Sequence, residues 1–210
     1  VKMQSLKSKG SYDGDILHLE NAYAKNENGY LSASGYVPFD LNIGSDNFGK
    51  FYVDKPINLK SQANLSDLPF LSPYIADLDS AEGNYIINLN IQGLINNLKR
   101  DGDVFIQNGV LYTRLLNDPI RIINGKAELY NNKLEIKNLS ARIARDKEKY
   151  KDEKLQNTLI NGEVNLNRFF NPYYNLKLLA KDASFRLLFL DISGTTNLDL
   201  SISGRDTVYI

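Results

Sequence analysis

The single histidine is the first residue to consider for chemistry, because an imidazole is the side chain best suited to proton transfer near neutral pH. His18 stands between Leu17 and Leu19, on the water-facing side of an expected strand. It has no serine or cysteine partner in a recognisable nucleophile motif. The sequence therefore predicts a surface histidine without a catalytic role.

Two Asp-Gly-Asp triplets, at 13–15 and 101–103, could begin calcium loops, because Ca²⁺ prefers carboxylate oxygens. Each stands immediately before an expected strand and lacks the remaining ligands, so we interpret both as turns. The sequence contains no cysteine, no zinc-ligand spacing, no phosphate-binding glycine loop and no Rossmann fingerprint. We expect a protein that is not an enzyme and that needs no metal or cofactor.

Charge and hydropathy exclude further classes. The 210 residues include 25 Lys and Arg and 25 Asp and Glu, so no net field attracts nucleic acid or an anionic membrane. No apolar run approaches the roughly 18 residues that a membrane-spanning helix needs. We expect Val1 and Ile210 to be cut ends of a longer chain, with any targeting signal or anchor beyond them.

The elements that would position any site are strands, because most of the sequence alternates apolar and polar residues. The clearest stretch is 85–93, in which Asn88, Asn90 and Gln92 alternate with Tyr85, Ile87, Leu89 and Ile91. Leu17, Leu19 and Tyr23 are likewise expected on one face. One-sided strands are typical of antiparallel sheets that are wet on one side.

Turn signals between these stretches predict a meander of hairpins, since Asn-Gly and Asp-Gly readily adopt positive φ angles. They are Asp13-Gly14, Asn28-Gly29, Asp101-Gly102, Asn108-Gly109, Asn124-Gly125 and Asn131-Asn132.

Two segments depart from the alternation. Apolar residues at helical spacing over 66–79 predict a short helix, kinked at Pro73. The run 145–154 has nine charged residues of mixed sign, which predicts a solvated loop between two strands.

Parts of the pattern recur. Asn21 corresponds to Asn138 at an offset of 117, and Gly35 corresponds to Gly162 at an offset larger by ten, the length of the run 145–154. We therefore expect about two repeats, 1–103 and 104–210, and an extended surface in place of a single pocket.

An ordered set of segments carries a family resemblance: 104–112, 120–129, 133–139, 160–166 and 174–178, with their Asn-Gly pairs and the phrase Tyr-Asn-Leu-Lys-Leu. It covers about half of the chain and resembles the AsmA-like proteins, most closely the TamB (translocation and assembly module) branch. The expected fold is all-β, an antiparallel meander of about two repeats with the short helix near 66–79, and the resemblance implies that this meander forms an extended, curved, taco-like groove.

The resemblance also implies a function: a bridge-like lipid-transfer groove that spans the periplasm of a diderm bacterium. Such a groove shields acyl chains and lets phospholipid slide between the inner and outer membranes. A role in outer-membrane protein assembly, an inner-membrane anchor and a β-barrel partner are implied through regions outside this chain.

The expected lining consists of the apolar positions of the alternating strands. They are Leu17, Leu19, Leu31, Val37, Ile57, Leu59, Ile87, Leu89, Ile91, Val104, Ile106, Ile122, Leu129, Leu134, Ile136, Val164, Leu166, Leu176, Leu178, Leu198, Leu200 and Ile202. Two alternatives remain open: a closed structural or adhesive β-module with a dry core, and a carbohydrate-binding sandwich. The second needs several aromatic side chains on one exposed face.

Overall fold

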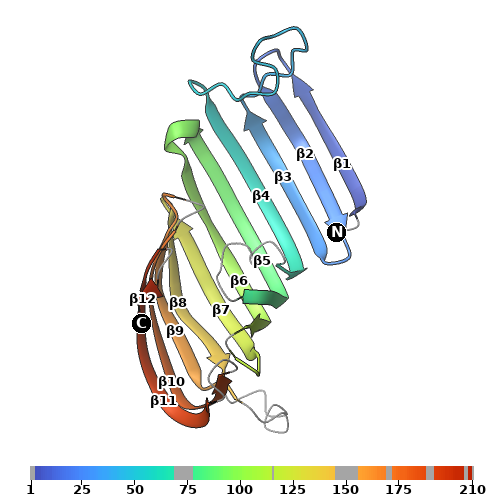
Figure 1. Cartoon of the computed structure of the whole chain (residues 1–210). Coiled ribbons are helices and arrows are strands. Elements are labelled where there is room, and N and C mark those ends of the chain that lie inside the picture. Colours follow the sequence, from blue (N-terminus) through green and yellow to red (C-terminus); the bar gives the residue numbers. More distant parts are fainter. Residues whose placement is uncertain are drawn as a thin grey trace. The chain divides into compact units, whose positions relative to one another are not determined.

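The computed structural model of the chain describes residues 3–68, 78–114, 116–144, 156–168, 172–187, 192–205 and 208–209. Within these ranges twelve strands form one antiparallel sheet, and each strand is hydrogen-bonded to its neighbours in chain order (Figure 1). The strands are β1 (Met3–Tyr12), β2 (Leu17–Asn26), β3 (Gly29–Val37), β4 (Pro56–Asp67), β5 (Leu78–Leu94), β6 (Lys99–Thr113), β7 (Ile120–Tyr130), β8 (Lys133–Arg142), β9 (Thr158–Asn165), β10 (Tyr173–Leu187), β11 (Ile192–Gly204) and β12 (Val208–Tyr209). A short 3₁₀ turn, η2 (Ile95–Asn97), joins β5 to β6.

The predicted antiparallel meander is confirmed. The strand order is linear, with β1 at one end and β12 at the other, and all strands of the described ranges belong to one open sheet. Such a sheet differs from the closed β-module of two packed sheets that the sequence left open.

The two segments that depart from the alternation lie largely outside the described residues. Residues 66–67 end β4 and residues 78–79 begin β5, so the ends of the predicted helix 66–79 are strand. Its remainder from 69 to 77, and the charged run 145–154, are not among the described residues.

The chain divides into two compact units, and β4, β5, β6 and β7 contribute residues to both. Unit 1 comprises Val1–Leu65, Ile86–Asp103 and Leu129–Asn132, and unit 2 comprises Ser66–Tyr85, Val104–Glu128 and Lys133–Ile210. The repeats at 1–103 and 104–210 stay a prediction.

Three of the six residue pairs that were predicted as turns lie inside strands. Asn131 and Asn132 both have positive φ angles, 48° and 66°, as a two-residue hairpin loop requires. Asp13-Gly14 and Asn28-Gly29 also lie at hairpin ends. In contrast, Asp101-Gly102, Asn108-Gly109 and Asn124-Gly125 lie inside β6 and β7, so the turn prediction is wrong for these three pairs.

The asparagines of two Asn-Gly pairs inside strands of unit 2, Asn124 and Asn161, each accept a hydrogen bond from the backbone of a residue with a positive φ angle. Between Ile136 and Leu139 the pairing of β8 with β9 shifts by one residue, so Lys137 and Asn138 stand opposite Asn161 alone. Asn138 has a φ of 56°, and its backbone N–H donates to Asn161 Oδ1 at 2.7 Å. This bulge, like a tight turn, places an asparagine at a positive φ angle, which explains the sequence signal.

An asparagine side chain binds the backbone N–H of a positive-φ residue in the same way at two further places in unit 2. The N–H of Asn108 donates to Asn124 Oδ1 at 2.8 Å, and the N–H of Asp182 donates to Asn197 Oδ1 at 2.9 Å. Asn108 and Asp182 each have a φ of 52°. At Asp182 the pairing of β10 with β11 shifts by one residue, and the asparagine side chain binds the amide that this bulge removes from the regular ladder.

Unit 1 contains a bulge at a position that the predicted repeat aligns with the bulge of Asn138. Glu20 and Asn21 stand opposite Ser34, and Asn21 is the residue that the offset of 117 aligns with Asn138. The shift places Tyr23 opposite Ser32, on the other face from Leu17 and Leu19. The prediction that Tyr23 shares their face is therefore wrong, because one extra residue inverts the side-chain alternation beyond it.

The hydrogen bond between the Asn138 amide and the Asn161 side chain gives a first testable prediction. We expect Asn161→Ala to lower the free energy of unfolding by about 1 kcal/mol, because it removes one hydrogen bond from the amide of Asn138. Urea denaturation measures the loss, and hydrogen exchange of the Asn138 amide should accelerate. Asn175→Ala, at an exposed position of β10, is the matched control. Unchanged hydrogen exchange of the Asn138 amide in the Asn161→Ala variant would contradict this role of the Asn161 side chain.

The connection between β3 and β4, at the top of Figure 1, folds around one buried carboxylate. Asp40 is only 2% exposed and accepts hydrogen bonds from Ser45 Oγ at 2.6 Å, the backbone N–H of Asn42 at 2.8 Å and Tyr52 Oη at 3.0 Å. The rings of Phe39 and Phe51 pack edge to face, with centroids 5.0 Å apart. The connection therefore has a fixed conformation of its own.

The order of this connection should depend on pH. The hydrogen bonds from Ser45, then from the Asn42 amide, hold the pKa of Asp40 below its ordinary value of 3.8. A lowered pKa in the folded state stabilises the connection above that ordinary value, and the contribution is lost as the pH falls through the lowered pKa. We expect exchange of the Asn42 amide to accelerate as the pH falls below about 3.8, beyond the intrinsic change. An equal acceleration in Asp40→Asn would contradict this assignment.

Candidate functional site

One face of unit 2 is apolar across four neighbouring strands. The register sets Val164 between Leu134 and Tyr174, and Leu176 between Gly162 and Ile202. Further along the strands, Leu178 lies between Ile160 and Leu200, and Ala180 lies between Thr158 and Leu198. Strands β8 to β11 thus place their apolar side chains in successive rows on a single face.

The opposite face of these strands is charged and exposed. Glu135 and Glu163 stand directly opposite each other, and their repulsion is offset because Lys137 pairs with the first and Lys133 with the second. Lys177 Nζ lies 3.2 Å from Asp199 Oδ1 on the next pair of strands. The hydrogen bond to Glu163 raises the pKa of Lys133 above its ordinary value. Exposed pairs such as these contribute little to stability, but they mark this side as hydrated.

The apolar face of unit 2 is covered only in part. Leu134, Ile136, Leu176, Leu198 and Leu200 are half-buried, between the exposed positions of the charged face and the few fully buried residues. Val164, Thr158 and Ala180 are fully buried on this face, and Ala180 belongs to a small cluster with Ile143 and Ala183, against which Ile120, Leu178 and Leu198 pack. A sheet with one large, half-open aliphatic face can take up an apolar guest without rearranging its backbone.

Unit 1 has an equivalent face on β2, β3 and β4. Leu17 pairs with Val37, Leu19 pairs with Gly35, and Gly35 pairs in turn with Leu59. Leu31 lies between Ala24 and Ala63 and is 47% exposed. Five of the predicted lining residues are therefore brought to one face of this unit: Leu17, Leu19, Leu31, Val37 and Leu59.

The remaining predicted residues lie in both units. Ile57 is buried, while Ile87, Leu89 and Ile91 alternate along β5 and Leu129 is half-buried in β7. Val104 and Ile106 flank the exposed Phe105 in β6. Leu166 lies just beyond the end of β9. Ile122 has a φ of 53°, and its neighbour Ile123 is the buried isoleucine.

The alternation in the sequence does not predict every residue of the apolar face of unit 2. Leu139 pairs with Ile160 on the apolar face of unit 2, although a strict alternation from Leu134 and Ile136 excludes it. The bulge at Lys137 and Asn138 causes the change of phase. The positive-φ preference of Asn138 is the one sequence signal that could have revealed it.

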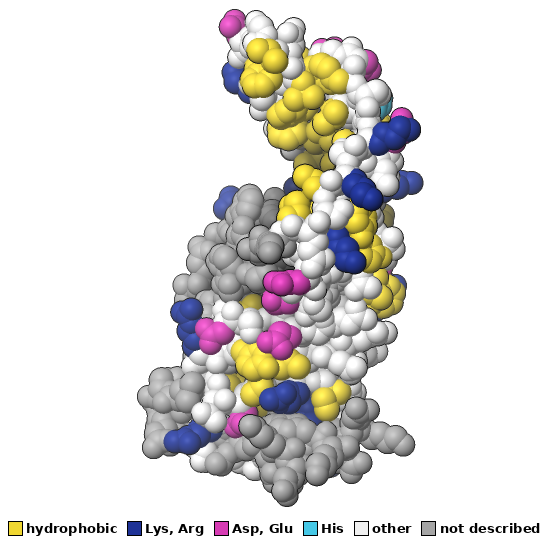
Figure 2. Space-filling model, turned by 90° about the vertical axis from the view of Figure 1, so that its right-hand side faces the viewer, with side chains coloured by type: hydrophobic (Ala, Val, Ile, Leu, Met, Phe, Trp, Pro, Cys, Tyr) yellow, Lys and Arg dark blue, Asp and Glu magenta, His cyan; other side chains and the backbone are white. Residues whose placement is uncertain are grey.

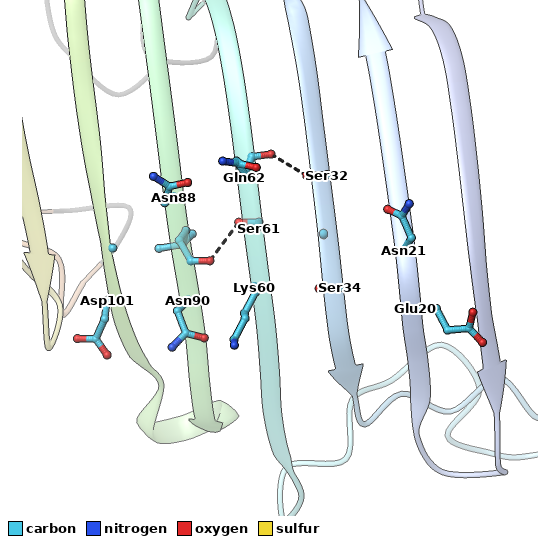
Figure 3. Close-up of a pocket in the computed structure, with 13 residues that line it drawn as sticks. Glu20, Asn21, Ser32, Ser34, Lys60, Ser61, Gln62, Asn88, Asn90 and Asp101 are labelled. Carbon is cyan, nitrogen blue, oxygen red and sulfur yellow. Dashed lines mark hydrogen bonds between the residues drawn. The ribbon is translucent and has the colours of Figure 1, made fainter.

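A polar hollow of about 600 Å³ lies on the other side of unit 1. Figure 3 shows its labelled side chains coming from β2 to β6. Asn88 donates to Asp103 Oδ2 at 3.0 Å beside it. Its lining residues are Glu20, Asn21, Ser32, Ala33, Ser34, Lys60, Ser61, Gln62, Asn88, Leu89, Asn90, Asp101 and Gly102. None of them is aromatic, so the hollow lacks the stacking platform that the carbohydrate-binding alternative requires.

His18 and Asp13 are held by contacts with nearby residues of the same turn. His18 Nε2 lies 3.2 Å from Asp13 Oδ2 at an exposed position. The N–H of Ile16 donates to Asp13 Oδ1 at 3.0 Å and is the main cause of the lowered pKa of Asp13. Asp13 therefore shapes a turn, as predicted, whereas Asp101 and Asp103 lie within β6. No group of three acidic, histidine or cysteine side chains within the described ranges is arranged to hold a metal ion.

In the described part of the chain, no helix has the length and apolarity to span a bilayer. Comparisons of the chain with protein-family models, with curated proteins and with solved structures gave no match.

Proposed function

We propose that this chain is a segment of a hydrophobic β-groove that shields the acyl chains of phospholipids. The observation that carries the proposal is the half-open aliphatic face of β8 to β11, backed by a charged and hydrated face. Protein side chains normally cover such a face, and the exposed remainder is suited to a hydrocarbon ligand.

The energetics favour acyl chains without a specific polar site. At about 0.8 kcal/mol for each buried methylene, two chains of roughly fifteen methylenes gain on the order of 20 kcal/mol against water. Because successive rows offer the same aliphatic chemistry, a bound lipid can move along them with little change in energy. Headgroups remain in water at the edge of the face.

The sequence resemblance to the AsmA-like proteins, TamB in particular, supports a more specific assignment. In that assignment the chain lies in the periplasm of a diderm bacterium and carries phospholipid between the inner and outer membranes. An inner-membrane anchor, an outer-membrane β-barrel partner and an assistance in outer-membrane protein assembly belong to this same proposal, through regions outside this chain.

Lipid analysis of the purified protein tests the proposal. The chain is expressed in a bacterial envelope, purified without detergent and extracted with organic solvent for mass spectrometry. We expect phospholipid at about one molecule or more per chain. A chain that carries no lipid, and that takes up no fluorescent fatty acid on titration, would instead be a structural or adhesive module.

A further inference from the structure

The connection 38–55, whose fold around Asp40 is described above, presents a concentration of apolar side chains to water. Ile43 is 88% exposed, and Phe48 and Val53 are both more than half exposed. The exposed apolar set of this connection is Leu41, Ile43, Phe48, Phe51 and Val53. Figure 2 shows hydrophobic side chains gathered at its upper end, the end at which this connection lies.

This surface is a protrusion. From Leu41 to Phe51 every residue except Ser45 is exposed, whereas a groove would be lined by half-buried side chains. The connection is also fixed to the sheet, because the N–H of Leu41 donates to Tyr12 Oη at 3.0 Å and Lys55 pairs with Asp15. The apolar side chains are therefore held out into solvent by a preorganised scaffold, and little further ordering is needed when they are buried.

The charges around the protrusion balance. The connection 38–55 contains five ionisable acidic and basic side chains, of which Asp40 is buried. The four at its surface, Asp46, Asp54, Lys50 and Lys55, sum to zero at neutral pH. Lys50 Nζ donates to the backbone carbonyl of Asp46 at 3.1 Å, so this cation stays beside its own loop. A neutral surface gains nothing from an anionic partner and suits one whose surface carries no net charge.

The size of the surface distinguishes a bilayer from a protein partner. Five aliphatic and aromatic side chains of this exposure offer roughly 500 Å², below the about 800 Å² that each partner of a stable protein complex contributes. A bilayer needs no matching surface, and a few aliphatic and aromatic side chains are enough to insert at its interface. Phe48, Phe51 and the neighbouring Tyr52 are side chains of the kind that lie at that interface.

We propose that the connection 38–55 docks on the surface of a zwitterionic phospholipid bilayer by inserting Ile43 and Phe48. The docking is a second activity, distinct from the uptake of single lipids on the aliphatic face. It would hold one edge of unit 1 against a membrane from which lipid enters or leaves.

Flotation with phosphatidylcholine vesicles tests the docking. We expect the full chain to float with the vesicles, and the double variant Ile43→Asp with Phe48→Asp to lose at least tenfold in vesicle affinity. Leu6→Asp, on β1 and 69% exposed, is the matched control and should stay within twofold of the unchanged chain. Circular dichroism of each variant establishes that the sheet is intact.

Two outcomes would overturn the docking. The first is that the unchanged chain does not bind vesicles at millimolar lipid. If the double variant then differs from the unchanged chain only in oligomeric state, the exposed side chains serve self-association and the docking proposal is wrong. The second is an equal loss of binding in Leu6→Asp. Leu200→Asp, a substitution on the aliphatic face of unit 2, is expected to lose bound lipid and still float, so failure of the docking and failure of the proposed lipid uptake are separately visible.

Discussion

Leu200→Asp is expected to empty the chain of co-purifying phospholipid, by at least tenfold relative to the unchanged protein. Leu200 is half-buried beside Leu178 on the aliphatic face, and a carboxylate there would have to lose its hydration when acyl chains cover it. Mass spectrometry of extracted lipid, normalised to protein, measures the effect.

Ser201→Asp is the matched control for this variant. Ser201 is the next residue of β11, it is exposed on the charged face, and it pairs with Lys177. The new carboxylate stays in water beside a cation, so lipid content and stability should both stay near those of the unchanged chain. Equal loss of lipid in both variants would mean that the face assignment is wrong.

Gly162→Ala is expected to cost about 3 kcal/mol or more of the free energy of unfolding. Gly162 has a φ of 139°, and an added Cβ would lie 2.3 Å from the carbonyl oxygen of Asn175 and 2.7 Å from the Cα of Leu176. Both are backbone atoms of β10, so neither can move without breaking the pairing of β9 with β10. Urea denaturation measures the loss.

Gly194→Ala provides the comparison. Gly194 has an ordinary φ, and no heavy atom lies within 4 Å of an added Cβ. We expect a change within about 0.5 kcal/mol, since the substitution adds neither strain nor a clash. A Gly162→Ala variant as stable as Gly194→Ala would contradict the close approach of β9 and β10.

The fold could be predicted because its main determinant is local. Alternation such as Leu176, Leu178 and Ala180 against Asn175 and Lys177 sets the face of each strand, and the chain order sets the neighbours. In the described ranges no distant segment is inserted between consecutive strands, so no long-range pairing had to be found.

The candidate site could be predicted only between bulges. Leu139 and Tyr23 fall on unexpected faces because a single extra residue inverts the alternation. The one sequence signal for it, the tolerance of Asn138 for a positive φ angle, is shared with hairpin turns. Asn124-Gly125 reports a need for positive φ, which a hairpin loop and a bulge share. The residue types alone therefore could not distinguish a hairpin loop from a bulge.

The connection 38–55 was not foreseen for a different reason. Its order depends on Asp40, whose carboxylate gathers Ser45, Asn42 and Tyr52 from separate parts of the connection. No periodic pattern encodes such a cluster, and its exposed side chains resemble ordinary strand residues when only the sequence is seen.

Site-specific photo-crosslinking along β11 tests the central claim most directly. A photoreactive amino acid is placed in turn at Leu198, Asp199, Leu200, Ser201 and Ile202, and attached phospholipid is detected by mass spectrometry. We predict crosslinks at 198, 200 and 202 and none at 199 and 201, the period of two that an acyl chain lying on one face imposes. Crosslinks without this period, or no lipid at any position, would contradict lipid binding on the aliphatic face.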